Sequence, residues 1–152
     1  MLPPPPAGLQ SGPVILRFDR IVHPDNPLEG ITGLVPFYHF KIMTRQGQPA
    51  GHINFRVGDT PHILQCAGHI GYEILAPFRG QGFAYHACIA LKPFIQTRYE
   101  RVIITCAPGN TASIKIITKL GACFINEICV PPDDPAYQSG ARKKKRYEWN
   151  LE

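Results

Sequence analysis

The sequence lacks the features of a membrane or secreted protein. Nowhere in its 152 residues does an uninterrupted apolar run approach the roughly 18 residues of a membrane-spanning helix. The opening residues Met1 to Pro6 have neither the basic start nor the apolar centre of a secretory signal peptide. We therefore expect a cytoplasmic protein with no membrane partner.

The cysteines lack any spacing that suits zinc or a disulfide framework. There are five of them, an odd number, without a CxxC pair or a Cys/His pattern. Most lie inside apolar runs, so we interpret them as reduced core thiols and expect no metal. The histidines His52, His62 and His86 also lack ligand spacing and are interpreted as surface or packing residues.

Composition excludes wholesale disorder, because 44% of residues are apolar and only 18% are charged. The length predicts one domain. Residues 1–13 are rich in Pro and Gly and are expected to form a flexible tail, which leaves 14–152 as the folded domain.

The net charge of +5 depends largely on one basic run, Lys143 to Arg146, with Arg142 just before it. The remaining charges are nearly balanced, and no aromatic stripe accompanies the run. We therefore interpret it as a solvated loop segment and expect no nucleic-acid partner.

Hydrophobic patterning predicts an α/β fold with a mixed sheet. Apolar positions at helical spacing predict a helix from Gly82 to Ile95, which Pro93 should kink or end early, and a second helix from Asn110 to Leu120. The strand, helix and strand around the first helix form a βαβ crossover with parallel strands. The predicted strands are Val14–Val22, Phe37–Met43, His52–Val57, His69–Leu75, Val102–Cys106, Cys123–Val130 and Arg146–Leu151.

Two segments contain residues suited to ligand binding or catalysis. In the first, a strand enters a glycine-bearing turn, Arg79 to Ala84, that opens a helix, where free backbone N–H groups can bind an anion such as phosphate. A tight turn with glycines for geometry alone is the other interpretation. In the second, Asn110 and Gly121 fit as the N-cap and the C′ residue of a helix, and a purely structural role explains both.

Together the two segments resemble the GNAT superfamily of acyl-CoA-dependent N-acetyltransferases. The family pattern Arg/Gln-x-x-Gly-x-Gly/Ala is matched by Arg79, Gly82 and Ala84. Its later Asn-x-x-Ser/Ala and Lys-x-Gly are matched at the positions Asn110, Ser113, Lys119 and Gly121. The resemblance covers about His52 to Leu151 and is similar to the RimJ/RimL-like branch. It implies a sheet with two splayed parallel strands and flanking helices.

The resemblance also implies acetyl-CoA as co-substrate. Backbone groups of Ile74 and Leu75 would pair with the pantetheine arm, Asn110 would bond the arm or the loop beside it, and Ser113 would face the thioester sulfur. The pyrophosphate would be held by the loop residues Arg79, Gly80, Gln81, Gly82, Phe83 and Ala84.

The sequence departs from the family pattern in two places. Many members carry a Tyr two residues before the family's Lys to protonate the leaving thiolate, and here that residue is Ile117. Ser113 is one candidate substitute, and a hydrogen bond to the helix backbone is the other interpretation of this residue. The segment from Pro24 to Val35, which should shape the acceptor pocket, is short and broken by Gly and Pro. For a general base the candidates are His69, Tyr72 and Glu73, with Tyr72 on the opposite strand face from the other two unless a bulge intervenes.

The predicted function is acetyl transfer to a primary amine of a small molecule or peptide, by direct attack on the thioester. The catalytic candidates are Glu73, Tyr72 and Ser113. The alternative is a GNAT-like domain that binds acyl-CoA without turnover, as a sensor or interaction module. We expect a monomer or homodimer.

Overall fold

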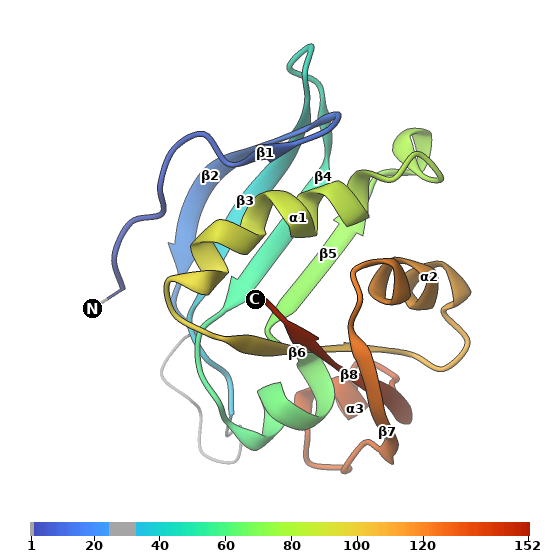
Figure 1. The fold of residues 1–152 in the computed structure, drawn as a ribbon. Coiled ribbons are helices and arrows are strands. Elements are labelled where there is room, and N and C mark those ends of the chain that lie inside the picture. The colour runs from blue at the N-terminus through green and yellow to red at the C-terminus, as the bar shows by residue number, and fades with distance from the viewer. Residues whose placement is uncertain (1, 25–32) are drawn as a thin grey trace.

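The structure, a computed structural model, describes residues 2–24 and 33–152. The strands form two sheets, and every pair within each sheet is antiparallel. The five-stranded sheet has the order β1-β2-β3-β4-β5, and the three-stranded sheet has the order β6-β8-β7 (Figure 1). The predicted combination of helices with a central sheet is confirmed, with the sheet divided in two. The strands expected as a parallel pair, β5 and β6, do not pair and lie at the edges of different sheets.

The first sheet contains the predicted early strands. Alternation along β3 and β4 points Tyr38, Phe40, Ile53 and Phe55 to one face, where they are buried. The bounds are β1 Gln10–Ser11, β2 Val14–Val22, β3 Phe37–Thr44, β4 Pro49–Arg56 and β5 Ile70–Ile74.

Helix α1 (Phe83–Gln96) crosses the apolar face of the first sheet (Figure 1). Its Phe94 ring meets Tyr38 edge-on, with 4.8 Å between centroids. Pro93 does not end the helix early, because the helix continues to Gln96. Pro93 lies on the exposed side, where water can reach the Ile89 carbonyl that loses its helical N–H partner.

The second sheet consists of β6 (Arg101–Cys106), β7 (Cys123–Cys129) and β8 (Lys143–Asn150). The basic run is not a solvated loop, because Lys143 to Arg146 form the first half of β8, the central strand. Trp149 and Tyr147 on the same strand are buried, at 2% and 6% exposure. The remaining helical elements are η1 (His62–Ala67), η2 (Ala76–Phe78), α2 (Thr111–Lys119) and α3 (Pro135–Gln138).

The two sheets meet at His69, just before β5. The His69 backbone N–H donates to the Ile103 carbonyl at 2.8 Å, and the Ile103 N–H donates to His69 Nδ1 at 2.9 Å. His69 Nε2 therefore carries the proton, which it donates to Asp59 at 3.0 Å. From this junction β5 and β6 diverge (Figure 1). His69, which is 2% exposed as a residue, thus has a structural role at this junction.

The structure differs from the expected flexible tail at Leu9 to Gly12. Leu9 is buried at 6% exposure, and its carbonyl accepts the Leu16 N–H at 2.9 Å. Arg45 donates to the Gly12 carbonyl at 2.7 Å, and Ser11 Oγ lies 2.9 Å from His86 Nδ1. One apolar side chain and strand pairing are enough to attach a segment whose composition suggests a linker.

The expectation of core thiols holds for three of the five cysteines. Cys66, Cys88 and Cys106 are buried, but Cys123 and Cys129 on β7 are exposed, and all five are free. β7 is an edge strand whose residues are mostly exposed, which the apolar sequence Cys123 to Val130 does not suggest. Among the described residues, none of the helices has the length and apolar character needed to cross a membrane.

Candidate acyl-CoA site

The turn from β5 into α1 leaves the first helical turn uncapped. Gly82 is the N-cap at φ +81°, a left-handed conformation that favours glycine, and it brings no side chain to the N–H groups that follow. No acidic residue occupies the first turn of α1. The first-turn amides and the positive end of the helix dipole are thus available to an anion.

The side chains of this turn bond back onto it. Arg79 Nε donates to the Ile74 carbonyl at 2.9 Å, and Gln81 Nε2 donates to the Pro77 carbonyl at 3.2 Å. Both side chains are exposed, so they stabilise the turn while they remain accessible to a ligand. Their roles toward a pyrophosphate stay predictions.

β5 is the outer strand of the first sheet, and no strand of the described residues pairs with its side toward β6. Arg56 N–H donates to the His69 carbonyl and Leu75 N–H donates to the Ala50 carbonyl, and no bulge interrupts the register between them. Because hydrogen-bonding direction alternates along a strand, the backbone groups of Tyr72 and Ile74 face the gap toward β6.

The backbone groups of Ile74 and Leu75 therefore point in opposite directions. The Leu75 N–H bonds Ala50, and its carbonyl accepts the Phe78 N–H at 2.9 Å, so neither group is free to pair with a pantetheine arm. The expectation for Leu75 needs correction, because the two-residue period of the strand directs it toward β4. The Ile74 N–H is directed toward the gap, while its carbonyl accepts the Arg79 Nε–H at 2.9 Å. The contact of Ile74 with a pantetheine arm stays a prediction.

Helix α2 has the predicted caps. Asn110 Oδ1 accepts the Ser113 N–H at 3.1 Å, and Gly121 follows the helix at φ +86°. The structural interpretation of both residues is confirmed. Asn110 is exposed, and its side-chain NH₂ group is not needed for the cap, so the predicted cofactor contact remains compatible with the cap.

Tyr72 and Ser113 come together although they are 41 residues apart. Their hydroxyl oxygens are separated by 2.7 Å, and Ser113 is 8% exposed. Burial raises the pKa of the Tyr72 phenol to about 12, while the hydrogen bond with Ser113 acts in the opposite direction. At neutral pH the phenol is therefore protonated and suits a hydrogen-bond or proton donor better than a base. Ile117, one turn after Ser113, is fully buried in the core.

Glu73 lies away from this pair. It is exposed on the opposite face of β5, where it stands across from His52 in the register. The bulge-free alternation that separates Tyr72 from Glu73 agrees with the sequence pattern. Arg56 occupies the same face near Gly71 and donates to the Ala67 and Gly68 carbonyls at 3.1 and 3.2 Å.

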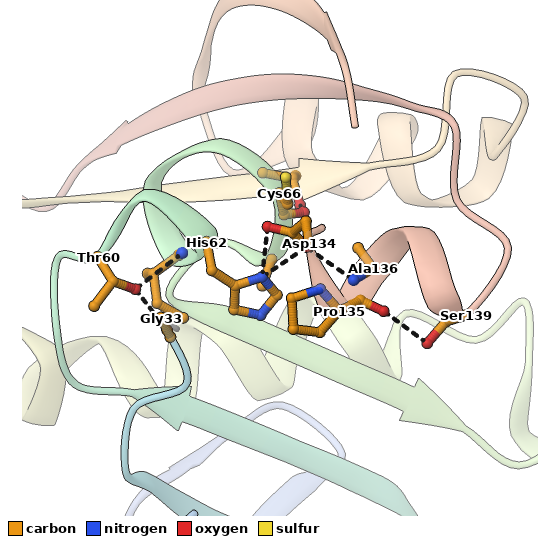
Figure 2. Close-up of polar contacts among 12 residues, drawn as sticks. Gly33, Thr60, His62, Cys66, Asp134, Pro135, Ala136 and Ser139 are labelled. Carbon is orange, nitrogen blue, oxygen red and sulfur yellow. Dashed lines mark hydrogen bonds and ion pairs between the residues drawn. The ribbon is translucent and has the colours of Figure 1, made fainter. Parts of the chain in front are cut away.

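One polar cluster was not predicted from the sequence. His62 Nδ1 lies 2.9 Å from an Asp134 carboxylate oxygen across 72 positions (Figure 2). No spacing pattern in the sequence predicts contact between two residues this far apart in the chain. Most of the segment Pro24 to Val35, expected to shape the acceptor pocket, lies outside the described residues.

Comparison with known proteins identifies the class that this fold and turn define. The family described as "Acetyltransferase (GNAT) domain" matches residues 17–122, more than half of the chain. The chain therefore belongs to the GNAT acetyltransferase family. Among curated proteins none matches the sequence significantly.

Three solved structures illustrate the likeness. A GNAT-family acetyltransferase from Bacillus anthracis is 21% identical over 74% of this chain and 66% of its own, with a TM-score of 0.58. The ribosomal L7/L12 α-N-protein acetyltransferase RimL, in complex with coenzyme A, is 20% identical over 75% of this chain and 62% of its own, with a TM-score of 0.57. The ribosomal-protein-S5-alanine acetyltransferase from Vibrio fischeri is 20% identical over 76% and 62%, with a TM-score of 0.58. The chain thus spans less than two thirds of each neighbour, and at these identities the likeness shows the fold.

Proposed function

We propose that this chain transfers the acetyl group of acetyl-CoA to a primary amine by direct attack. The observation that carries the proposal is the uncapped first turn of α1, directly after the unpaired side of β5. Family membership and the coenzyme A complex of RimL support it. The five free thiols support a reducing, cytoplasmic location.

The residues present fit such a co-substrate, which supplies an activated acetyl thioester. Amides from Gln81 to Ala84 would hold the pyrophosphate, with Gly80 giving the turn its shape and Arg79 adding positive charge. The backbone groups of Tyr72 and the N–H of Ile74 would bond the amides of the pantetheine arm. Asn110 would contact the arm through its free NH₂ group. Among the described residues no group of three His, Cys, Asp or Glu is placed to bind a metal.

The proposed chemistry needs one proton removed and one supplied. As the amine nitrogen bonds the carbonyl carbon, backbone N–H groups polarise the carbonyl, and the carbon–sulfur bond then breaks. The nitrogen loses one proton and the thiolate gains one. Ser113 would donate a hydrogen bond to the departing sulfur, with Tyr72 behind it. Glu73 faces the other way, so a proton reaches it only through intervening water.

Turnover with a panel of amines tests this function. Steady thiol release from acetyl-CoA is expected with at least one of an N-terminal peptide, a lysine peptide or spermidine. RimL is named as an α-N-protein acetyltransferase and the Vibrio fischeri neighbour as a ribosomal-protein-S5-alanine acetyltransferase, so N-terminal peptides are the first acceptors to test. Binding of acetyl-CoA without thiol release across the panel would favour the sensor alternative, which the Ile117 position supports.

Removing either hydroxyl of the Tyr72–Ser113 pair should slow turnover without weakening acetyl-CoA binding. We expect kcat to fall about tenfold to a hundredfold in Ser113→Ala, as for the loss of one charge-assisted hydrogen bond of roughly 1.5–3 kcal/mol. Tyr72→Phe should act through the same pair, so the double variant should be no slower than the slower single variant. The measurement is steady-state kinetics, with Thr118→Ala on the exposed side of α2 as the control.

The pH profile of the wild-type protein tests the same pair. A phenol with a pKa near 12 stays protonated across the usual range, so the rate should rise with pH as the acceptor amine becomes neutral and show no fall below about pH 10. A bell-shaped profile, or complete loss of turnover in Ser113→Ala with binding intact, would contradict this assignment.

A further inference from the structure

A pocket lies beside the turn that begins α1, on the side of the N-terminal tail and the β3–β4 hairpin. Its volume is about 360 Å³, within the range of small-ligand pockets. Gln81 and Phe83 of the turn form one wall, and the opposite walls come from the tail, at Gly12 and Pro13, and from the hairpin, at Arg45. The pocket is therefore continuous with the turn that we propose to hold the pyrophosphate.

His86 of α1 holds the tail against the start of its own helix. Ser11 Oγ lies 2.9 Å from His86 Nδ1. The imidazole also lies against two glycines, since a Cβ at Gly12 would be 2.6 Å from His86 Cε1 and a Cβ at Gly82 would be 3.7 Å from His86 Cδ2. The tail, the imidazole and the N-cap of α1 thus pack together, and the hairpin joins them through Arg45.

Arg45 gives this pocket its charge. Among the described residues that line the pocket, it alone carries a formal charge. Arg45 Nε donates to the Gly12 carbonyl at 2.7 Å, and Arg45 Nη1 donates to Gln10 Oε1 at 2.8 Å. Both acceptors are neutral, and Arg45 forms no ion pair with a described residue. The guanidinium is therefore oriented by the tail while its charge stays uncompensated.

These features suit an anion that accepts hydrogen bonds. The planar guanidinium matches phosphate oxygens, and the two bonds to the tail leave its Nη2 group available to them. No Asp or Glu of the described chain lines the pocket to repel such a ligand. Because Gly12 and Gln10 already hold the Arg45 side chain, less conformational entropy is lost when an anion binds.

Coenzyme A carries a suitable anion close to its pyrophosphate. Its ribose bears a 3′-phosphate, and this sugar is bonded directly to the pyrophosphate. If the turn holds the pyrophosphate, the adjoining pocket is within reach of the sugar. Phe78, half-buried and edge-on to Phe83 with 5.6 Å between ring centroids, adds an apolar wall on which the adenine can stack.

We propose that Arg45 binds the 3′-phosphate of coenzyme A in this pocket. The inference rests on the proposed acetyltransferase function, since it assigns a phosphate of that reaction's co-substrate. It makes Arg45 a specificity residue, which distinguishes coenzyme A from the same molecule without its 3′-phosphate. Gln10 and Gly12 are then positioning residues, so a tail whose composition suggests a linker contributes to cofactor binding.

A rival cation lies on the α2 side of α1. Lys119 Nζ is 4.2 Å from the centroid of the Tyr85 ring, and Tyr85 is in the first turn of α1. Lys119 is exposed, like Arg45. The aromatic face already interacts favourably with the ammonium. A variant of Lys119 therefore shows on which side of α1 the 3′-phosphate binds.

Calorimetric titration of the full-length protein with coenzyme A and with dephospho-coenzyme A tests the contact. The two ligands differ only in the 3′-phosphate. We expect the wild-type protein to bind coenzyme A about fivefold to tenfold more tightly, which lies between an exposed ion pair and a hydrogen bond to a charged group. Equal affinities for the two ligands would overturn the proposal.

Variants assign the preference to a residue. Arg45→Gln should bind coenzyme A about fivefold to tenfold more weakly and dephospho-coenzyme A as the wild-type protein does. Arg45→Lys keeps the charge without the planar fork and should keep part of the preference. Arg101→Gln removes an exposed positive charge at the start of β6 and should change neither affinity.

Lys119→Gln should retain the preference for coenzyme A. An unchanged preference in Arg45→Gln, or loss of the preference in Lys119→Gln alone, would overturn the proposal.

The same titrations keep this proposal and the proposed function distinguishable. Binding of coenzyme A without a preference that depends on Arg45 would overturn the Arg45 contact and leave the proposed function standing. If neither ligand binds, the proposed function is contradicted, and the Arg45 contact with it.

Discussion

Gly82→Asp should lower the affinity for acetyl-CoA by about a hundredfold, because it places a carboxylate where the proposed pyrophosphate is held and like charges in contact cost several kcal/mol. The side chain has room, since a Cβ at this position meets only His86 Cδ2, at 3.7 Å. Calorimetric titration measures the affinity. In a thermal melt, the stabilisation of roughly 2.7 kcal/mol expected of the wild-type protein at about 100 times its dissociation constant should fall to about 0.4 kcal/mol at the same acetyl-CoA concentration.

Gly82→Asn is the matched control for this variant. Asn has nearly the same shape as Asp, tolerates the left-handed conformation of Gly82, and carries no charge. Its affinity should fall much less than that of Gly82→Asp. Equal affinities in the two variants would show that charge at the start of α1 does not matter, and the turn would lose its assignment as the anion site.

Deletion of Arg146 to Glu152 should abolish cooperative folding. These residues form most of β8, the strand on which both β6 and β7 pair. They bring Tyr147, Trp149 and Leu151 into the core, and Gln96 of α1 donates to the Leu151 carbonyl. Truncation of a buried Trp alone costs about 3–5 kcal/mol, and small domains are stable by only about 5–15 kcal/mol.

Circular dichroism and thermal melts distinguish the outcomes of this truncation. The control lacks only Glu152, which is exposed, and should melt as the full chain does. A soluble truncated protein that lacks all seven residues and still melts cooperatively would show that the second sheet is not part of the same folding unit.

Local patterns predicted most helices and strands because residues close together in the chain determine which side chains are buried and how a helix is capped. The helix from Asn110 has its side-chain cap and its glycine, and the apolar stripe of α1 matches the buried positions Ala84, Ala87, Cys88 and Leu91. Sequence patterns were least informative for β8, which begins at Lys143. A lysine side chain can pack its alkyl chain on a half-buried strand while its charge stays in solvent, so a run of lysines does not indicate a strand.

The candidate site was only partly predictable. The turn at Gly82 could be predicted from the sequence because its left-handed backbone conformation favours glycine. The Tyr72–Ser113 and His62–Asp134 pairs depend on how separate elements pack, and nothing in the residues between them records that contact. Tyr72 was a base candidate by position, and only its burial and its bond to Ser113 recommend it as a donor.

The separation of the sheets at His69 leaves β5 and β6 as two sheet edges that face each other inside one molecule. An exposed edge normally invites another strand to add to it, which is a route to aggregation. Here each edge restricts access to the other, and the paired bonds of His69 and Ile103 close the gap at one end. The backbone groups of Tyr72 and the N–H of Ile74, on the β6 side of β5, take no part in either sheet. A ligand chain with its own amide groups that pairs with them would therefore break no bond of either sheet.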